Sequence, residues 1–152
     1  VTDSYNYRVV KFDSATLVKD SEIGSLGTGD DEFAFPESVT TDGTSIYVAD
    51  SDNIRVVRRS MSLVYEAQSN NTDYYPVNCA ITSGGNLYVC DPYPTIEPFV
   101  ARVVVLNPST FAYISEINAV TGTVFVQFGR LKSICNDGEF IYFIEFGLGG
   151  VR

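Results

Sequence analysis

The stretch Ile46-Tyr-Val-Ala-Asp-Ser-Asp-Asn-Ile-Arg-Val-Val57 decides the fold of this chain. Its first part, Ile46 to Asp50, predicts a buried strand, because a short apolar run bounded by turn residues is typical of a sheet interior. Ser51 to Asn53 carries side chains that favour a tight turn. Ile54 to Val57 predicts a second strand that returns beside the first. The stretch therefore predicts two neighbouring antiparallel strands joined by a short turn.

Degraded copies of this stretch recur along the chain. They begin at Val1-Thr-Asp-Ser-Tyr-Asn-Tyr-Arg-Val-Val10, Leu87-Tyr-Val-Cys-Asp91 and Ile141-Tyr-Phe-Ile-Glu145. An acidic residue takes the same place in each copy, at positions 3, 50, 91 and 145, so the intervals are 47, 41 and 54 residues. A period of about 40 to 50 residues with four short strands is typical of β-propeller blades. An all-β sandwich, the alternative, would not regenerate Tyr-Val-x-Asp at the same place.

Turn residues divide this all-β chain into units of four-stranded antiparallel blades. We expect one propeller domain over 1–152, with blade units at about 1–37, 38–77, 78–132 and 133–152. The first unit has only the late strands of a blade and the last only the early ones, which gives about three blade equivalents with incomplete blades at both termini. Three blades are too few to close a propeller. The missing strands are expected from a longer protein, from a second copy in a ring, or from neighbours in a fibre.

Composition narrows the function classes. The 152 residues include 45% hydrophobic ones, which indicates a globular chain. The formal charge of −9 argues against nucleic-acid partners, because phosphate contact needs a cationic surface. The local basic cluster of Arg55, Arg58 and Arg59 is expected at an exposed strand edge. Histidine is absent, which excludes Ser-His-Asp and Cys-His catalysis and imidazole zinc sites.

The repeat resembles that of NHL-type β-propellers, whose pattern is roughly Pro, two residues, an apolar strand, Asp-Gly, Ile-Tyr-Val-Ala-Asp-Ser, Asn and Arg-Val. The best copy follows it closely, through Phe35-Pro36, Asp42-Gly43, Ile46–Ser51, Asn53 and Arg55-Val56. The other copies keep less of the pattern. The resemblance covers almost the whole chain and implies the propeller fold. It implies no single activity, because such propellers include scaffolds, ligand binders, lyases and lactonases.

The acidic residue and the arginine of the repeat are expected to be structural. An Asp followed by Ser at a strand end accepts backbone N–H bonds across the next turn. The arginine five residues later in the first two copies is then expected to pair with a neighbouring carboxylate. The structural positions of the repeat are Asp3, Arg8, Asp50, Arg55, Asp91 and Glu145.

The three cysteines allow at most one disulfide. If Gly84-Gly85 forms a two-residue hairpin turn, counting outward along the strands places Cys79 opposite Cys90. Directly opposed residues come close enough for a bond only at a non-hydrogen-bonded pair. The alternative is that Cys79 and Cys90, like Cys135, are small buried thiols on inner strands.

Two loops carry candidate surface features. Asn70-Asn71-Thr72 is the only glycosylation sequon, since Pro108 blocks the one at Asn107, so Asn70 is the glycosylation candidate. The proline-rich segment 91–99 is expected to form a stiff loop inserted between two strands. Its contact residues would be Tyr93, Ile96 and Phe99. The loop either binds a partner or folds back on its own blade. Residues 119–128 are expected to add a hairpin or an edge strand.

A metal-dependent enzyme is the rival class. A lactonase-like hydrolase or lyase would gather carboxylates around the central channel, with calcium as the candidate ion. Asp42, Asp137 and the run Asp30–Glu32 are the candidates. The first two lie in Asp-Gly turns that need these residues for backbone reasons, and the acidic run lacks the spacing of a calcium loop. We therefore predict no catalytic residue, no metal ligand and no cofactor.

These observations favour a non-enzymatic scaffold or protein-interaction propeller of a secreted or cell-surface protein. Lysines make up only three of the ten basic residues, while Ser, Thr, Asn and Tyr are plentiful, which favours export. The chain begins at Val1 without a basic-then-apolar leader, so any targeting signal is expected either to have been removed or to lie outside this sequence. The expected partners are proteins or further copies of the chain, joined through the incomplete blades. No apolar run is long enough for a membrane span.

Overall fold

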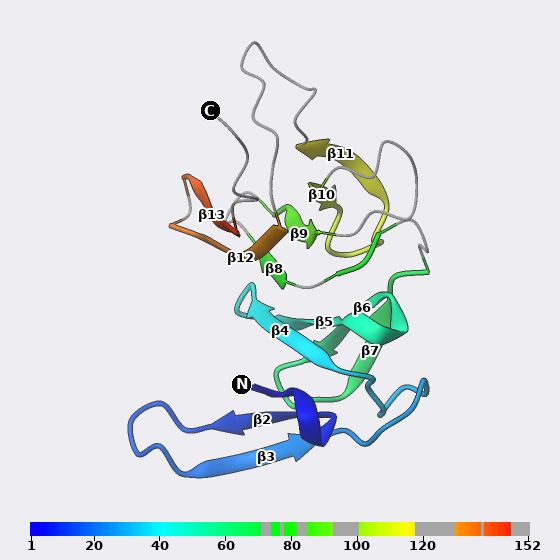
Figure 1. Cartoon of the computed structure of the whole chain (residues 1–152). Helices are drawn as coiled ribbons and strands as arrows, with labels where there is room; N and C mark the ends of the chain where they lie inside the picture. Colours follow the sequence, from blue (N-terminus) through cyan, green and yellow to red (C-terminus); the bar gives the residue numbers. More distant parts are fainter. Residues whose placement is uncertain are drawn as a thin grey trace.

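The regular secondary structure of the described chain is almost entirely β-strand, and the strands form four successive antiparallel sheets (Figure 1). The computed structural model describes residues 1–70, 74–76, 78–81, 85–92, 101–117, 130–137 and 139–146. In each sheet the strand order follows the chain. No described helix is long and apolar enough to cross a membrane. Two short 3-10 turns, η1 (Ser4–Asn6) and η2 (Ser51–Asn53), join strands in the first two sheets.

The sheets are numbered I to IV. Sheet I comprises β1 (Thr2–Asp3), β2 (Arg8–Phe12) and β3 (Lys19–Ile23). Sheet II comprises β4 (Pro36–Thr41), β5 (Ser45–Asp50), β6 (Arg55–Ser60) and β7 (Tyr65–Gln68). Sheet III comprises β8 (Asn78–Ile81), β9 (Leu87–Asp91), β10 (Arg102–Leu106) and β11 (Tyr113–Ile117). Sheet IV comprises β12 (Arg130–Asn136) and β13 (Ile141–Phe146).

The stretch over Ile46–Val57 forms the predicted strand, turn and returning strand. β5 pairs with β6 along its whole length. The turn between them is η2, which ends at Ile54 in the left-handed conformation, with φ of 54°. β5 is buried on both faces from Ile46 to Asp50. This double burial explains why its sequence is a continuous apolar run rather than an alternating one.

The outermost strand of sheet II, β7, begins at Tyr65, after a tight turn that follows β6. Residues 60–64 form this turn, in which the Ser60 amide bonds the Val64 carbonyl at 2.9 Å. The Ser60 hydroxyl also accepts the amides of residues 62 and 64. Serine side chains that bond nearby backbone groups favour such turns over strands.

An apolar cluster fills each joint between neighbouring sheets, because the side chains of a strand alternate between its two faces. The I–II joint contains Val9, Phe33, Ile46, Val48, Val57 and Leu63. The II–III joint contains Tyr47, Ala49, Val56, Tyr74, Cys79, Leu87, Val89, Val104, Leu106 and Phe111. The III–IV joint contains Cys90, Ala101, Val103, Leu131 and Ile134.

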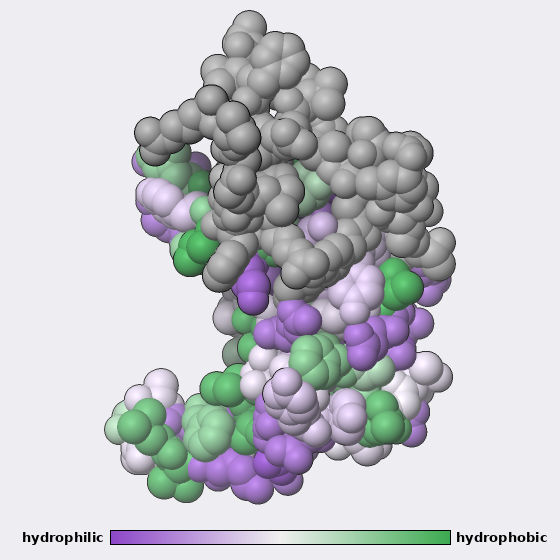
Figure 2. Space-filling view, in the orientation of Figure 1, coloured by the Kyte–Doolittle hydropathy of each residue, from purple (hydrophilic) through white to green (hydrophobic). Residues whose placement is uncertain are grey.

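The sheets follow an arc from sheet I at the bottom of Figure 1 to sheet IV at the upper left. The first strands of sheets II, III and IV, which are β4, β8 and β12, are neighbours in space. In the space-filling view, the outline is hollowed between the arm of sheet I and the strands of sheet IV (Figure 2). The arc is that of successive propeller blades around a common centre.

Cys79 and Cys90 do not face each other, so the register behind the predicted disulfide is wrong. Cys79 pairs with Val89, and Asn78 pairs with Cys90. Successive side chains point to opposite faces, so the Cys79 thiol lies in the II–III joint and the Cys90 thiol in the III–IV joint. Both thiols are free. Ile81 pairs with Leu87, so an odd number of residues separates this pair where the expected two-residue turn requires an even number, and the register shifts by one residue.

The alternative that all three thiols are buried is wrong for Cys135. Cys135 lies on β12 and is exposed, whereas Cys79 and Cys90 are buried. Burial raises the pKa of both Cys79 and Cys90 to about 12, because the thiolate is poorly solvated there.

We expect one fast-reacting thiol in the native protein and three after unfolding in urea. Cys135 should react with Ellman's reagent at pH 8 at the rate of an exposed thiol, while Cys79 and Cys90 should react only as the chain unfolds. Replacing Cys135 with Ser should abolish the fast phase and leave two slow thiols. Two fast thiols in the native parent, or a pair missing from the urea titration, would contradict this arrangement.

Candidate functional site

The carboxylate of Asp50 joins three segments of sheet II. Its Oδ2 accepts hydrogen bonds from Arg55 Nε and Asn53 Nδ2, each at 2.8 Å. Its Oδ1 accepts the Ala34 amide at 2.7 Å, from the loop that leads into the sheet. Asp50 and Arg55 are both buried. We call this arrangement of the repeat Asp and the following arginine the Asp–Arg clasp.

The clasp recurs in sheets I and III. Arg8 Nε donates to Asp3 Oδ2 at 2.9 Å, and Arg102 Nε donates to Asp91 Oδ2 at 3.0 Å. The Tyr75 amide donates to Asp91 Oδ1 at 3.1 Å, as the entering loop does in sheet II. A second nitrogen of each arginine reaches the outermost strand of its own sheet, at Glu22, Gln68 and Glu116. In each of these sheets, one arginine side chain thus joins the last three strands.

Sequence reasoning missed Arg102 as a member of this set. An insertion places it eleven positions after its Asp91 partner, whereas the other two arginines follow their Asp by five. The available signal is that Arg102 begins the next-to-last strand of its sheet, as Arg8 and Arg55 begin theirs. The backbone of Glu145 pairs with Leu131, the register that Asp50 makes with Pro36. The Glu145 side chain lies outside the described residues.

The clasps differ in their electrostatic environment. Desolvation raises the pKa of Asp50, although its bonds to Asn53, Arg55 and the Ala34 amide act in the opposite direction. The pKa of the more exposed Asp3 is lowered, chiefly by its bonds to Asn6 and Arg8. A buried carboxylate stays ionised only while its partners remain. The carboxylate of Asp50 therefore serves to stabilise sheet II through its bonds to Arg55, Asn53 and the Ala34 amide.

The serine that follows Asp in the repeat links one sheet to the next. Ser4 Oγ donates to the Pro36 carbonyl at 2.7 Å, and Ser51 Oγ donates to the Pro76 carbonyl at 2.6 Å. The Asp-Ser dipeptide thus acts within a sheet through its carboxylate and between sheets through its hydroxyl. Asp91 is followed by Pro92, which has no hydroxyl, so this link cannot form in the same way from sheet III.

The basic cluster is not an exposed strand edge, so that prediction is wrong. Arg55 and Arg59 are buried, and β6 is an interior strand. Arg55 donates to the backbone carbonyls of residues 28, 29 and 32. Arg59 donates to the Leu63 carbonyl at 2.7 Å and to the Asp30 carbonyl, and its guanidinium lies over the Phe33 ring. The loop at residues 28–32, which precedes sheet II, covers the two arginines with its carbonyl groups.

The candidate carboxylates do not come together. Asp31 pairs with Arg59 at 3.1 Å, beside the outermost strands of sheets I and II. Asp42 Oδ1 instead accepts the amides of residues 44 and 45 in the β4–β5 turn, and Asp42 Oδ2 accepts the Tyr47 hydroxyl at 2.9 Å. Asp137 does the same in the β12–β13 turn, where the Tyr142 hydroxyl donates at 2.7 Å. No described group of three His, Cys, Asp or Glu side chains is placed to hold a metal ion.

These turn bonds lower the pKa of both turn carboxyls to about 2. For Asp42, the amides of residues 44 and 45 and the Tyr47 hydroxyl outweigh the desolvation, which acts in the opposite direction. For Asp137, the Phe140 amide has the largest effect, followed by the Tyr142 hydroxyl. Gly43 has a φ of 89°, which glycine adopts without strain. The Asp-Gly turn is thus used for backbone geometry, as the sequence predicts.

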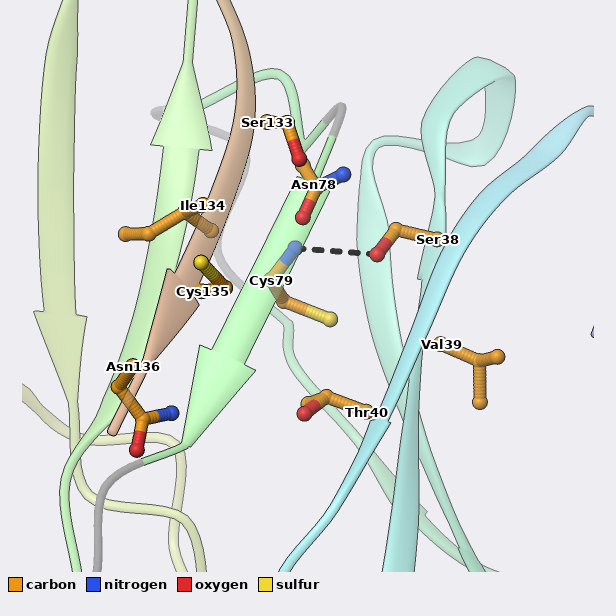
Figure 3. Close-up of a pocket in the computed structure, with 9 residues that line it drawn as sticks. All are labelled: Ser38, Val39, Thr40, Asn78, Cys79, Ser133, Ile134, Cys135 and Asn136. Atoms are coloured by element: carbon orange, nitrogen blue, oxygen red, sulfur yellow. Dashed lines mark hydrogen bonds between the residues drawn. The ribbon is translucent and has the colours of Figure 1, made fainter. Parts of the chain in front are cut away.

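A polar groove of about 380 Å³ runs along the first strands of sheets II, III and IV (Figure 3). Its polar lining comes from Ser38, Thr40, Asn78, Ser133, Cys135 and Asn136. The Cys79 amide points across it to Ser38 Oγ at 3.4 Å, from β8 to β4. Its described lining has no carboxylate and no basic side chain. Hydroxyl and amide groups can hydrogen-bond a neutral polar molecule, but they offer no acid–base pair at neutral pH.

The remaining predicted positions are at the surface or outside the described part. Asn70 is exposed after β7, and the other two sequon residues lie outside the described residues. The contact residues Tyr93, Ile96 and Phe99 also lie outside them, as does the segment 119–128. The glycosylation and loop-contact predictions therefore remain predictions.

The comparisons with known proteins identify the fold. No family model and no curated protein matches the chain. A structure of Kuenenia stuttgartiensis hydrazine synthase is similar with a TM-score of 0.70 and 15% identity, over 98% of this chain and 39% of that one. A structure of U3-55K is similar with a TM-score of 0.64 and 13% identity. A structure of the WD40 repeats of RRP9 is similar with a TM-score of 0.63 and 12% identity. Each of these two matches covers 86% of this chain and 36% of the other.

At these identities the likeness concerns the fold alone, and this chain spans less than two fifths of each similar structure. WD40 repeats are propeller blades of four strands. The fold prediction is confirmed. The chain is an all-β propeller segment with two four-stranded blades, flanked by sheets in which three and two strands are described.

The turn carboxyl of Asp42 should make stability depend on pH below about 4. Its folded pKa of about 2 lies below the ordinary 3.8, so ionisation stabilises the fold above pH 4, and this contribution disappears as pH falls through 2. Asp42→Asn keeps the Oδ1 acceptor without the charge. In urea unfolding, the parent should exceed this variant in free energy of unfolding at pH 7, with the gap closing by about pH 2. A gap that does not change with pH would contradict this account.

Proposed function

We propose that this chain belongs to a non-enzymatic, NHL-type propeller that serves as a scaffold or protein-interaction module of a secreted or cell-surface protein. The observation that carries the proposal is the use of the repeat's charged residues. Asp50 and Arg55 are the charged pair of the best repeat, and their hydrogen bonds stabilise the sheet and its entering loop. The repeat thereby builds a rigid surface rather than a reacting centre.

The NHL assignment rests on how the motif residues are used. The Asp of the motif accepts from its Arg and its Asn in both of the best copies. The Ser that follows the Asp donates to the carbonyl of a proline, which begins the next sheet at Pro36 and lies two residues before it at Pro76. These contacts explain why Asp-Ser, Asn, Arg and Pro recur together at fixed spacing. They support the assignment because each residue of the pattern has its own structural partner.

The rival function, a hydrolase or lyase with a carboxylate-bound metal in the channel, has less support. The described groove along the first strands is lined by hydroxyl, amide and thiol groups. Asp42 and Asp137 bond their own turns, and Asp31 pairs with Arg59 beside the outer strands. A calcium site would need several of these carboxylates to converge on one point.

The proposed location and partners follow from surface chemistry. The net charge of −9 disfavours nucleic acid and favours proteins with basic surfaces. An exported protein would present the exposed Asn70 for glycosylation. Self-association through incomplete blades belongs to the same proposal, since open sheet edges and faces favour pairing with another chain.

Calorimetric titration with Ca²⁺ and Zn²⁺ separates the two functions. The scaffold proposal predicts no stoichiometric uptake at micromolar affinity, because the carboxylates already have protein partners. Asp42→Asn with Asp137→Asn serves as the matched variant for any weak surface binding. Tight uptake of one ion per chain that this double variant abolishes would overturn the proposal in favour of a metal-dependent enzyme. Uptake that the double variant retains would overturn it as well, with the site elsewhere.

A further inference from the structure

A groove of about 500 Å³ lies between the outer edges of sheets I and II, which are the two lower sheets of Figure 1. One wall comes from β3 and the loop at residues 28–32, and the other from the turn at residues 60–64 and the start of β7. Both walls belong to segments in the interior of the sequence. The apolar part of the lining comes from Ile23, Leu63, Val64 and Tyr65. Apolar side chains that line a surface groove indicate a contact site.

The buried Arg59 holds the two walls of this groove together. Its guanidinium donates to the Leu63 carbonyl in the turn at 2.7 Å and to the Asp30 carbonyl in the loop. The same group pairs with the carboxylate of Asp31 at 3.1 Å. Because one side chain binds both walls, the groove has its shape before a partner arrives. A preformed site avoids part of the ordering cost of binding.

The charged part of the lining is acidic. Glu22, Asp30 and Asp31 line the groove, and no Lys or Arg belongs to its described lining. Glu22 pairs with basic side chains of sheet I, and Asp31 pairs with Arg59. Asp30 is exposed, and within the described residues its carboxylate has neither a hydrogen bond nor an ion pair. Its charge is therefore available to a cationic group, which the net charge of −9 would also attract.

The neighbouring joint shows how a basic side chain binds at such a turn. Arg58 of sheet II donates to the carbonyls of Pro108 and Ser109, in the turn between β10 and β11, at 3.0 and 2.8 Å. The corresponding turn at the groove joins β6 to β7. Lys11 of sheet I corresponds to Arg58, since each lies three residues after a clasp arginine. Lys11 pairs with Asp20 of its own sheet instead. A basic side chain from another protein can therefore take the place that Arg58 takes in the neighbouring joint.

We propose that the groove between sheets I and II binds a segment of a partner protein that combines lysine or arginine with apolar residues. A basic side chain of the segment pairs with Asp30, and its apolar neighbours pack on Ile23 and on Val64, which is 63% exposed. The apolar stem of the basic side chain adds to this contact. The inference rests on the protein-interaction function proposed above, and it specifies the site and the chemistry of the partner.

Fluorescence anisotropy with labelled synthetic peptides tests the groove on the whole chain. The probe is a short peptide that alternates lysine with leucine. Two comparison peptides replace its lysines with glutamate or its leucines with serine. The lysine–leucine peptide should bind most tightly, the lysine–serine peptide more weakly, and the glutamate–leucine peptide should not bind. Raising NaCl from about 50 to about 300 mM should weaken the binding, because salt screens exposed charges.

Charge reversal in the groove locates the binding. Asp30→Lys should weaken the lysine–leucine complex at least about tenfold, because it places a like charge against the peptide. The change leaves the backbone carbonyl of Asp30, which binds Arg59, in place. Glu139→Lys is the matched control, because it alters the net charge by the same amount at an exposed site in the β12–β13 turn of sheet IV. It should leave the affinity unchanged.

Fast reaction of Cys135 alone with Ellman's reagent verifies that each variant is folded. A parent that does not bind the lysine–leucine peptide, or equal losses in Asp30→Lys and Glu139→Lys, would overturn the inference. A dimer of the parent that Val64→Asp dissociates would overturn it as well, in favour of a second copy in the groove. Tight metal uptake by a chain that still binds the peptide would overturn only the non-enzymatic function, so the two failures are distinguishable.

Discussion

A buried carboxylate organises each of the two four-stranded blades of this chain. In sheet II, Asp50 receives the entering loop at one oxygen and the third strand's arginine at the other. Such a charge is tolerated inside a protein only when every partner is in place. The arginine in turn needs carbonyls for its remaining donors, and the loop at residues 28–32 supplies them. The conformation of this loop and the joining of the last three strands of sheet II therefore depend on a single ion pair.

The same constraint explains where the repeat is kept and where it is lost. Sheets I and III preserve the clasp although their loops differ in length, because the arginine begins the next-to-last strand in each case. The serine link to the next sheet is less constrained, and Pro92 replaces it after Asp91. Arg59 lies four residues after the clasp arginine, where sheets I and III have the apolar Phe12 and Leu106. Asp31 and nearby carbonyls balance its charge. Deviations thus appear where a local partner compensates.

The fold and the structural nature of the repeat could be predicted from sequence because both depend on local order. A continuous apolar run followed by Asp-Ser-Asp-Asn specifies strand and turn, and its recurrence specifies the blade. Register could not be predicted for Cys79 and Cys90, because it depends on whether the loop at 82–86 holds an odd or an even number of residues. The burial of Arg55 and Arg59 was also beyond local reasoning, since the covering carbonyls lie more than twenty positions away.

A double-mutant cycle between Asp50 and Arg55 tests the central role of the clasp most directly. The free energy of urea unfolding is measured for the parent, Asp50→Asn, Arg55→Gln and the double variant. A coupling of about 2 kcal/mol or more is predicted, because either single change leaves a buried group without its partner. The more exposed pair Asp3 and Arg8 should couple more weakly, because water screens the two charges. Additive effects at Asp50 and Arg55, within about 0.5 kcal/mol, would contradict the account.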